Sequence, residues 1–318
     1  MTARRVLCAI TDDAPGYPGS IAAWRSTGYL LADCGRDLVV WDPDTAAVII
    51  RVRHGATARE GLPLMTIAVD DDTGMIALAH GVRDFALWSL DRMERQRVFA
   101  GHGEQVRAVV FADDAVVSGS GDGTVRRWDR MRGACRAALA VGPTYALARH
   151  PTADVIAACG AEDAAGRITL LDDFEVARSI LVPLAPLPDH APLSDEHRRR
   201  LGAAADRRDA RITCAAWHPD GRHLVTGGHD FGVTLVDAAT GALVRTWYGH
   251  AHWVTAVAVT ADGARVISAS TDGQVRVWDA ASDACLVEHP ALPAAALALH
   301  LRGDRIVAGC ADGWIYEF

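Results

Sequence analysis

The pattern of apolar and polar residues predicts short β-strands separated by tight turns. Residues 253–289 read WVTAVAVTADGARVISASTDGQVRVWDAASDACLVEH and hold four apolar runs, WVTAVAV, ARVISAS, QVRVWD and ACLVEH. The sequences ADG and TDG separate the first three runs, and both carry residues that favour turns. Four short strands joined by such turns form one blade of a β-propeller.

A dipeptide at the end of the third strand marks a repeat along the chain. Trp-Asp occurs at positions 41, 128 and 278, and related dipeptides occur at 88 (Trp-Ser), 171 (Leu-Asp) and 236 (Val-Asp). Phe318 takes the same place in the final segment, ADGWIYEF. The intervals are 40–47 residues except for one of 65 between positions 171 and 236. The spacing predicts an all-β chain in which residues 1–318 form a single seven-bladed propeller.

Two segments resemble the WD40 repeat family, and the resemblance extends over essentially the whole chain. Its marks are Gly-His before a first strand, at 101–102 and 249–250, Asp-Gly in the second turn, at 122–123 and 272–273, and the closing Trp-Asp. The resemblance implies a buried hydrogen-bonded set in each of these repeats. The two sets are His102, Ser118, Asp122 and Trp128 in repeat three, and His250, Ser268, Asp272 and Trp278 in repeat six.

The other repeats depart from this pattern. Repeat seven keeps His289 and Asp312, repeat five keeps Thr226 and Asp230, and repeats one, two and four hold fragments at most. We expect apolar packing to replace the polar set in those blades.

The last repeat ends after three strands, so we expect the N-terminus to complete it. Residues 4–10, RRVLCAI, lie within the first ten residues and form a strand-like run. As in the family's ring closure, this strand would cover an edge that could otherwise recruit other chains.

The long interval contains an insertion of about 25 residues near 183–209, between blades four and five. Its first part is rich in proline, which favours extended or irregular chain. Ser194 followed by Asp195 and Glu196 then predicts a helix start, with a helix over about 195–206. The insertion is either a tolerated surface loop or an element that docks a partner or covers the channel.

Composition indicates a globular protein of a reducing compartment. Half of the residues are apolar and the net charge is −8, which argues against nucleic acid as a partner. The seven cysteines are scattered, and the N-terminus resembles neither a signal peptide nor a membrane span. We therefore expect a cytoplasmic protein with no membrane contact, and the composition suggests a bacterial source.

Three candidate chemistries are weak on sequence grounds. The run SGSGDG at 118–123 resembles a phosphate loop, but a strand without the Lys-Ser/Thr signature follows it. His218, His223 and His229 do not show a known metal-ligand spacing, and Asp70–Asp72 form a turn. We therefore predict no catalytic residue, no metal and no cofactor, although a propeller enzyme with a hydrolase-like site in the channel stays an alternative.

The rim of the propeller is where we expect a protein or peptide partner. Trp253, Arg211 and Gln105 occupy equivalent positions where first strands begin, and Thr255, Thr213, Arg107 and Tyr145 follow two residues later. In the WD40 family these positions commonly face the channel mouth. Because exposed Trp, Tyr and Arg dominate binding energy at interfaces, we predict partner contacts at Trp253, Arg107, Arg211, Tyr145, Gln105 and Thr255. The predicted function is a non-enzymatic interaction scaffold or subunit, with a nucleic-acid-binding propeller as a weaker alternative.

Overall fold

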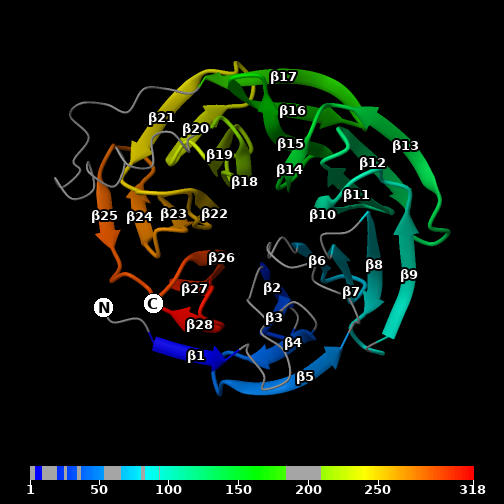
Figure 1. Cartoon of the computed structure of the whole chain (residues 1–318), viewed down its shortest axis with the longest axis horizontal. Helices are drawn as coiled ribbons and strands as arrows, with labels where there is room; N and C mark the ends of the chain where they lie inside the picture. Colours follow the sequence, from blue (N-terminus) through cyan, green and yellow to red (C-terminus); the bar gives the residue numbers. More distant parts are fainter. Residues whose placement is uncertain are drawn as a thin grey trace.

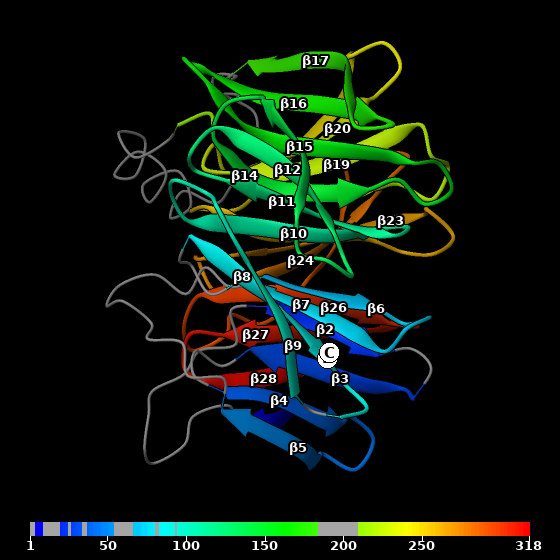
Figure 2. The same cartoon turned by 90° about the vertical axis from the view of Figure 1, so that its right-hand side faces the viewer.

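A computed structural model describes residues 4–8, 20–24, 27–33, 37–53, 66–79, 83–92, 94–183 and 209–318. These residues form seven antiparallel sheets of four strands, arranged as blades around a central axis (Figure 1). The view from the side shows the sheets stacked around the ring (Figure 2). The predicted all-β seven-bladed propeller is therefore confirmed.

Each blade takes four strands in chain order from the centre outward, except the seventh. Blade one has β2 (Ser20–Trp24), β3 (Tyr29–Asp33), β4 (Asp37–Asp42) and β5 (Ala47–Arg53), and blade two has β6 (Thr66–Asp70), β7 (Met75–Ala79), β8 (Asp84–Ser89) and β9 (Glu94–Ala100). Blade three has β10 (Val106–Ala112), β11 (Ala115–Ser120), β12 (Thr124–Asp129) and β13 (Cys135–Ala140), and blade four has β14 (Thr144–Arg149), β15 (Val155–Glu162), β16 (Ala165–Asp172) and β17 (Glu175–Pro183). Blade five has β18 (Ile212–Trp217), β19 (His223–Gly228), β20 (Gly232–Asp237) and β21 (Leu243–Tyr248), and blade six has β22 (Val254–Val259), β23 (Arg265–Ser270), β24 (Val275–Asp279) and β25 (Cys285–Glu288). Blade seven has β26 (Ala296–Arg302), β27 (Arg305–Cys310) and β28 (Trp314–Glu317).

The ring closes through the N-terminal strand, as the sequence predicts. Strand β1 (Arg4–Cys8) pairs antiparallel with β28 and supplies the fourth strand of blade seven. Arg4 lies opposite Glu317 and Cys8 opposite Trp314 in this pairing. The two ends of the chain therefore lie close together (Figure 1).

The core lies between neighbouring blades, because each sheet has another sheet on both of its faces. One apolar cluster joins Leu31 and Val40 of blade one to Ile76 and Leu78 of blade two, and all four side chains are buried. Inner and middle strands consequently read as continuous apolar runs instead of strict alternation. The Asp-Gly turns at Gly123 and Gly273 have φ of 83° and 80°, a region that glycine enters without steric cost.

The described residues include no helix, and thus none of the length and apolarity that a membrane span requires. The helix expected over about 195–206 is not confirmed, because residues 184–208 lie outside the described part of the chain.

Candidate functional site

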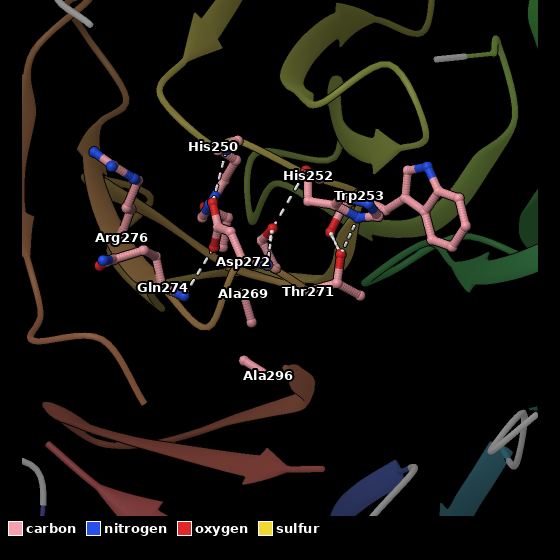
Figure 3. A network of polar contacts seen from close by, with 12 residues as sticks. His250, His252, Trp253, Ala269, Thr271, Asp272, Gln274, Arg276 and Ala296 are labelled. Carbon is pink, nitrogen blue, oxygen red and sulfur yellow. Dashed lines mark hydrogen bonds and ion pairs between the residues drawn. The ribbon is translucent and has the colours of Figure 1, made fainter. Parts of the chain in front are cut away.

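The four polar residues singled out in repeat six form one connected network inside blade six. His250 Nδ1 lies 3.1 Å from Asp272 Oδ2, and His250 Nε2 lies 2.7 Å from Ser268 Oγ. Trp278 Nε1 donates to the same Ser268 oxygen at 2.8 Å. Figure 3 shows one end of this network, where His250 and Asp272 face each other. Since indole only donates and a carboxylate only accepts, Trp278 donates to Ser268 at one end of the network and Asp272 accepts from the His250 ring at the other.

Blade three repeats this arrangement with nearly the same distances. His102 Nδ1 lies 2.9 Å from Asp122, His102 Nε2 lies 2.7 Å from Ser118, and Trp128 Nε1 donates to Ser118 at 2.8 Å. Burial lowers the pKa of His102, against the opposing effect of Asp122, so the imidazole is neutral. His102, Ser118 and Trp128 are buried, so these residues stabilise the blade from inside.

The carboxylates at the ends of these networks are strongly held in their ionised form. Burial alone would raise the pKa of Asp272, but His250 and the backbone N–H groups of Ala251 and Gln274 outweigh burial and hold it at about 2. The two N–H groups donate to Asp272 at 2.8 Å each. A buried charge with this many donors stabilises the blade instead of serving as a proton acceptor in catalysis.

The other blades have different contacts at the positions equivalent to the four polar residues of blades three and six. Trp41 and Trp88 are buried, but their Nε1 atoms find no acceptor within the residues that the structure describes. In blade seven, Asp312 accepts a hydrogen bond of 2.5 Å from the Tyr316 hydroxyl. Apolar packing therefore replaces the full polar set in blades one and two, in agreement with their sequence.

The rim where inner strands begin holds a group of aromatic and charged side chains. The Arg107 guanidinium of β10 lies 4.8 Å from the centre of the Tyr145 ring of β14, and Arg211, next to β18, lies 6.0 Å from the same ring. Arg107 Nε is buried and has no hydrogen-bond partner in the described parts of the chain. Two cations thus meet at one aromatic ring, from blades three and five on either side of blade four.

The group continues through a carboxylate at the end of the insertion. Asp209 accepts from Arg211 Nε at 2.9 Å and from its Nη2 at 2.5 Å, and lies 3.1 Å from His229 Nδ1. Burial raises the pKa of Asp209, but the Arg211 hydrogen bonds outweigh this and hold it at about 2. Burial lowers the pKa of His229 despite the neighbouring carboxylate.

The group of side chains at the rim ends in blade six, where two aromatic rings are stacked. The His229 ring is stacked on the Trp253 indole, with centroids 4.1 Å apart and planes 7° from parallel. His252 packs against the same indole at 4.7 Å and holds Thr271 Oγ1 at 2.5 Å. Figure 3 shows the Trp253 ring projecting away from the His250–Asp272 pair. We call this continuous set the rim cluster; its members are Arg107, Tyr145, Asp209, Arg211, His229, His252 and Trp253.

Four of the six residues expected to contact a partner lie in the rim cluster, and two have other roles. The Thr255 hydroxyl donates to the carbonyls of Ala296 at 2.6 Å and Ala269 at 3.1 Å, so it ties blade six to blade seven. Gln105 is half-buried, and its carbonyl accepts from the Gly121 N–H at 3.0 Å. Neither residue has a described contact to the rim cluster, and their partner contacts stay predictions.

Sequence reasoning missed Asp209, His229 and His252. A signal for His229 exists, because it follows Thr226 by three residues, as Thr271 follows Ser268 in blade six. Both positions lie in the second turn of their blades, at the same end as the start of the inner strand. His229 is thus part of the rim, while His218 and His223 lie around Asp220 at the other end of blade five.

The thiols nearest the core are poor nucleophiles. Burial raises the pKa of Cys159 to about 12 and that of Cys310 to about 11. Cys214 is also buried and its pKa is raised further by the same cause. These side chains remain protonated at neutral pH and act as small core residues. Asp70 lies in the turn expected for Asp70–Asp72, where it accepts from the Asp72 N–H and pairs with Arg130.

Comparison with known proteins agrees with the architecture. The WD domain, G-beta repeat model matches residues 93–129 and 241–279, and the anaphase-promoting complex subunit 4 WD40 domain model matches residues 197–259. The chain is similar to human Striatin-4, with 25% identity over 76% of this chain and 32% of the relative. It is also similar to nuclear distribution protein nudF of Emericella nidulans, with 27% identity over 60% of this chain and 43% of the relative.

A third relative, the human U3 small nucleolar RNA-associated protein 4 homolog, is 30% identical over 36% of this chain and 18% of its own length. The chain spans less than half the length of each of these relatives. All three are eukaryotic, so the bacterial source suggested by composition stays a prediction.

Proposed function

Because the chain is a seven-bladed propeller that carries WD40 repeats, we propose that it is a non-enzymatic scaffold or subunit that binds a protein or peptide partner at the rim cluster. The single observation that carries this proposal is the continuity of the cluster. It joins side chains of blades three, four, five and six through the cation–π, ion-pair and stacking contacts described above. A surface built across four blades suits a macromolecular partner better than a small substrate.

The chemistry of the rim cluster suits a protein interface. Tyr145 and Trp253 are half-buried, and the Arg211 side chain is 41% exposed, so each keeps surface for a partner. Trp, Tyr and Arg combine large contact area with hydrogen-bond donors and dominate interface energies. Their mutual contacts hold the side chains in place before binding, which reduces the entropy lost on association.

The described end of the insertion lies in this proposed surface. Its last residue, Asp209, lies between Arg211 and His229 in the rim cluster. This position of Asp209 favours the docking role of the insertion over a tolerated surface loop. The helix expected over about 195–206 stays part of this proposal.

The names of the matching model and of one relative also support a role in macromolecular assemblies. One matching model is named for a subunit of the anaphase-promoting complex, and one relative for association with the U3 small nucleolar RNA. The three buried, protonated thiols fit a reducing compartment, and we propose a cytoplasmic location.

The proposal is tested by affinity capture from a lysate of the source organism with three baits. These are the unmodified chain, a Trp253→Ala/Arg107→Ala double variant, and a Met131→Ala control. Met131 is 74% exposed in the turn between β12 and β13, at the opposite end of its blade. We expect a protein recovered by the unmodified chain and the control, and lost or at least tenfold reduced with the double variant. Equal recovery of every captured protein by all three baits would contradict the proposal.

A further inference from the structure

The turn between β18 and β19 brings three potential metal ligands together at the face opposite the rim cluster. One ligand atom each from His218, Asp220 and His223 lie within 4.8 Å of one another. The three side chains are 18%, 38% and 22% exposed, so solvent reaches them. Two imidazoles and one carboxylate match the donors that bind Zn²⁺ and related transition-metal ions.

The first imidazole is held with its lone pair toward the other ligands. His218 Nε2 lies 2.9 Å from the Gly263 carbonyl oxygen in blade six. Because a carbonyl only accepts, Nε2 carries the proton, and Nδ1 presents its lone pair. Nδ1 accepts from Asp220 N–H at 3.2 Å and also lies 3.0 Å from Asp220 Oδ2.

That geometry places two acceptor atoms where one cation could bridge them. An imidazole lone pair and a carboxylate oxygen 3.0 Å apart repel each other, and a bound metal ion would relieve this repulsion. Metal-ligating histidines commonly donate their other ring N–H to a backbone carbonyl, as His218 does to Gly263. The ring also has little room to turn, since a Cβ on Gly263 would lie 2.6 Å from it.

The carboxylate divides its two oxygens between the turn and the two rings. Asp220 Oδ1 accepts the N–H groups of Arg222 at 2.8 Å and His223 at 3.0 Å, which fixes the turn. Oδ2 is left facing both rings, at 2.7 Å from His223 Nδ1 and 3.0 Å from His218 Nδ1. The ligand atoms of the three residues therefore lie within 4.8 Å of one another around Asp220 Oδ2.

Blade four shows that the contact from this turn to the next blade needs only a histidine at the position of His218. His150 occupies the place of His218, and its Nε2 lies 2.8 Å from the carbonyl of Gly221 in blade five. Thr152 and Val155 take the places of Asp220 and His223. Blade four thus keeps the contact to the next blade without a carboxylate or a second imidazole, so the contact alone does not account for Asp220 and His223.

We propose that His218, Asp220 and His223 form a site for a divalent transition-metal ion of the Zn²⁺ type, with a fourth position open to water or to a ligand from a partner. Tetrahedral zinc has bonds of about 2.0–2.2 Å, which separates its ligand atoms by about 3.3–3.6 Å. The present separations of 2.7 and 3.0 Å require the rings and the carboxylate to move apart by less than about 1 Å.

The test is zinc titration of the metal-stripped full chain, followed by competition with a chromophoric chelator. We expect one Zn²⁺ per chain, with affinity reduced at least about tenfold in His223→Gln and in Asp220→Asn. Asp220→Asn keeps an oxygen for the turn, so its loss of affinity would report the charge. The control Asp283→Asn removes a carboxylate that is 88% exposed in the turn between β24 and β25, and should leave zinc affinity unchanged. Circular dichroism and melting curves check that each variant is folded.

Two results would overturn the proposal. One is the absence of saturable zinc binding by the unmodified chain. The other is zinc binding that His223→Gln and Asp220→Asn leave unchanged, which would place the ion elsewhere. A zinc-dependent rise in melting temperature for the unmodified chain and Asp283→Asn, absent in His223→Gln, would support the site independently of affinity.

Discussion

Replacing Asp272 with Asn removes a buried charge from blade six and leaves the shape of the side chain. The Ala251 N–H donates to Oδ2 and the Gln274 N–H to Oδ1, so the amide keeps one of these two acceptors and loses the negative charge that faces His250. The pKa of Asp272 lies at about 2 in the folded chain, against an ordinary value of 3.8. This difference corresponds to about 2 kcal/mol of folding free energy at neutral pH.

The sign of the pH dependence follows from the lowered pKa. The unfolded chain binds a proton at Asp272 more readily than the folded chain does, so the stabilisation is complete above about pH 5 and is lost as the pH falls toward 2. At pH 3 about half of it should remain, or about 1 kcal/mol. Asp272→Asn should therefore be at least about 2 kcal/mol less stable than the unmodified chain at pH 7, and this gap should be about 1 kcal/mol smaller at pH 3.

Urea unfolding followed by tryptophan fluorescence measures this difference at both pH values. Asp283→Asn is the matched control, because the Asp283 side chain is 88% exposed and should change stability little. A stability gap for Asp272→Asn that is equal at pH 7 and pH 3 would refute the assignment of the effect to the charge. A gap below about 0.5 kcal/mol at pH 7 would refute the stabilising role itself.

Three further predictions follow from closure and close packing. Deleting residues 1–10 removes β1 and exposes the edge of β28, so the chain should aggregate in light scattering; a soluble variant with an unchanged melting temperature would rule this out. Gly228→Ala would place a Cβ 1.9 Å from the Arg211 carbonyl oxygen, and melting curves should show a loss of about 1–3 kcal/mol, whereas unchanged melting would show that the backbone relaxes freely. Thr255→Val removes the hydroxyl that donates to Ala296 and should cost about 1 kcal/mol in urea unfolding; no loss would mean that this contact does not hold blades six and seven together.

The blades could be predicted because the residues that define each one lie close together in the sequence. The Trp-Asp dipeptide, the Asp-Gly turns and the Ser at a fixed offset lie within about forty residues of one another, and the strand register follows from the apolar runs. The same local pattern located both hydrogen-bonded networks, whose members the structure brings within 2.7–3.1 Å.

Contacts between blades could not be predicted as well. Arg107 and Trp253 belong to one cluster because the ring places β10, β14, β18 and β22 side by side, and no local spacing encodes that. His229 was grouped with the other turn histidines, although it lies at the opposite end of blade five from His218 and His223. Those two histidines, in turn, meet at Asp220 because β18 and β19 form a hairpin, with Trp217 opposite Leu224.

Hydrogen–deuterium exchange of the full chain with and without the captured partner tests the central claim most directly. Partner binding at the rim cluster should slow exchange at the starts of the inner strands β10, β14, β18 and β22 and in the turn that holds His229. The turns at the other end of the blades, including that of Met131, should exchange at unchanged rates. Protection confined to those opposite turns, or to the outer strands, would contradict the proposed binding face.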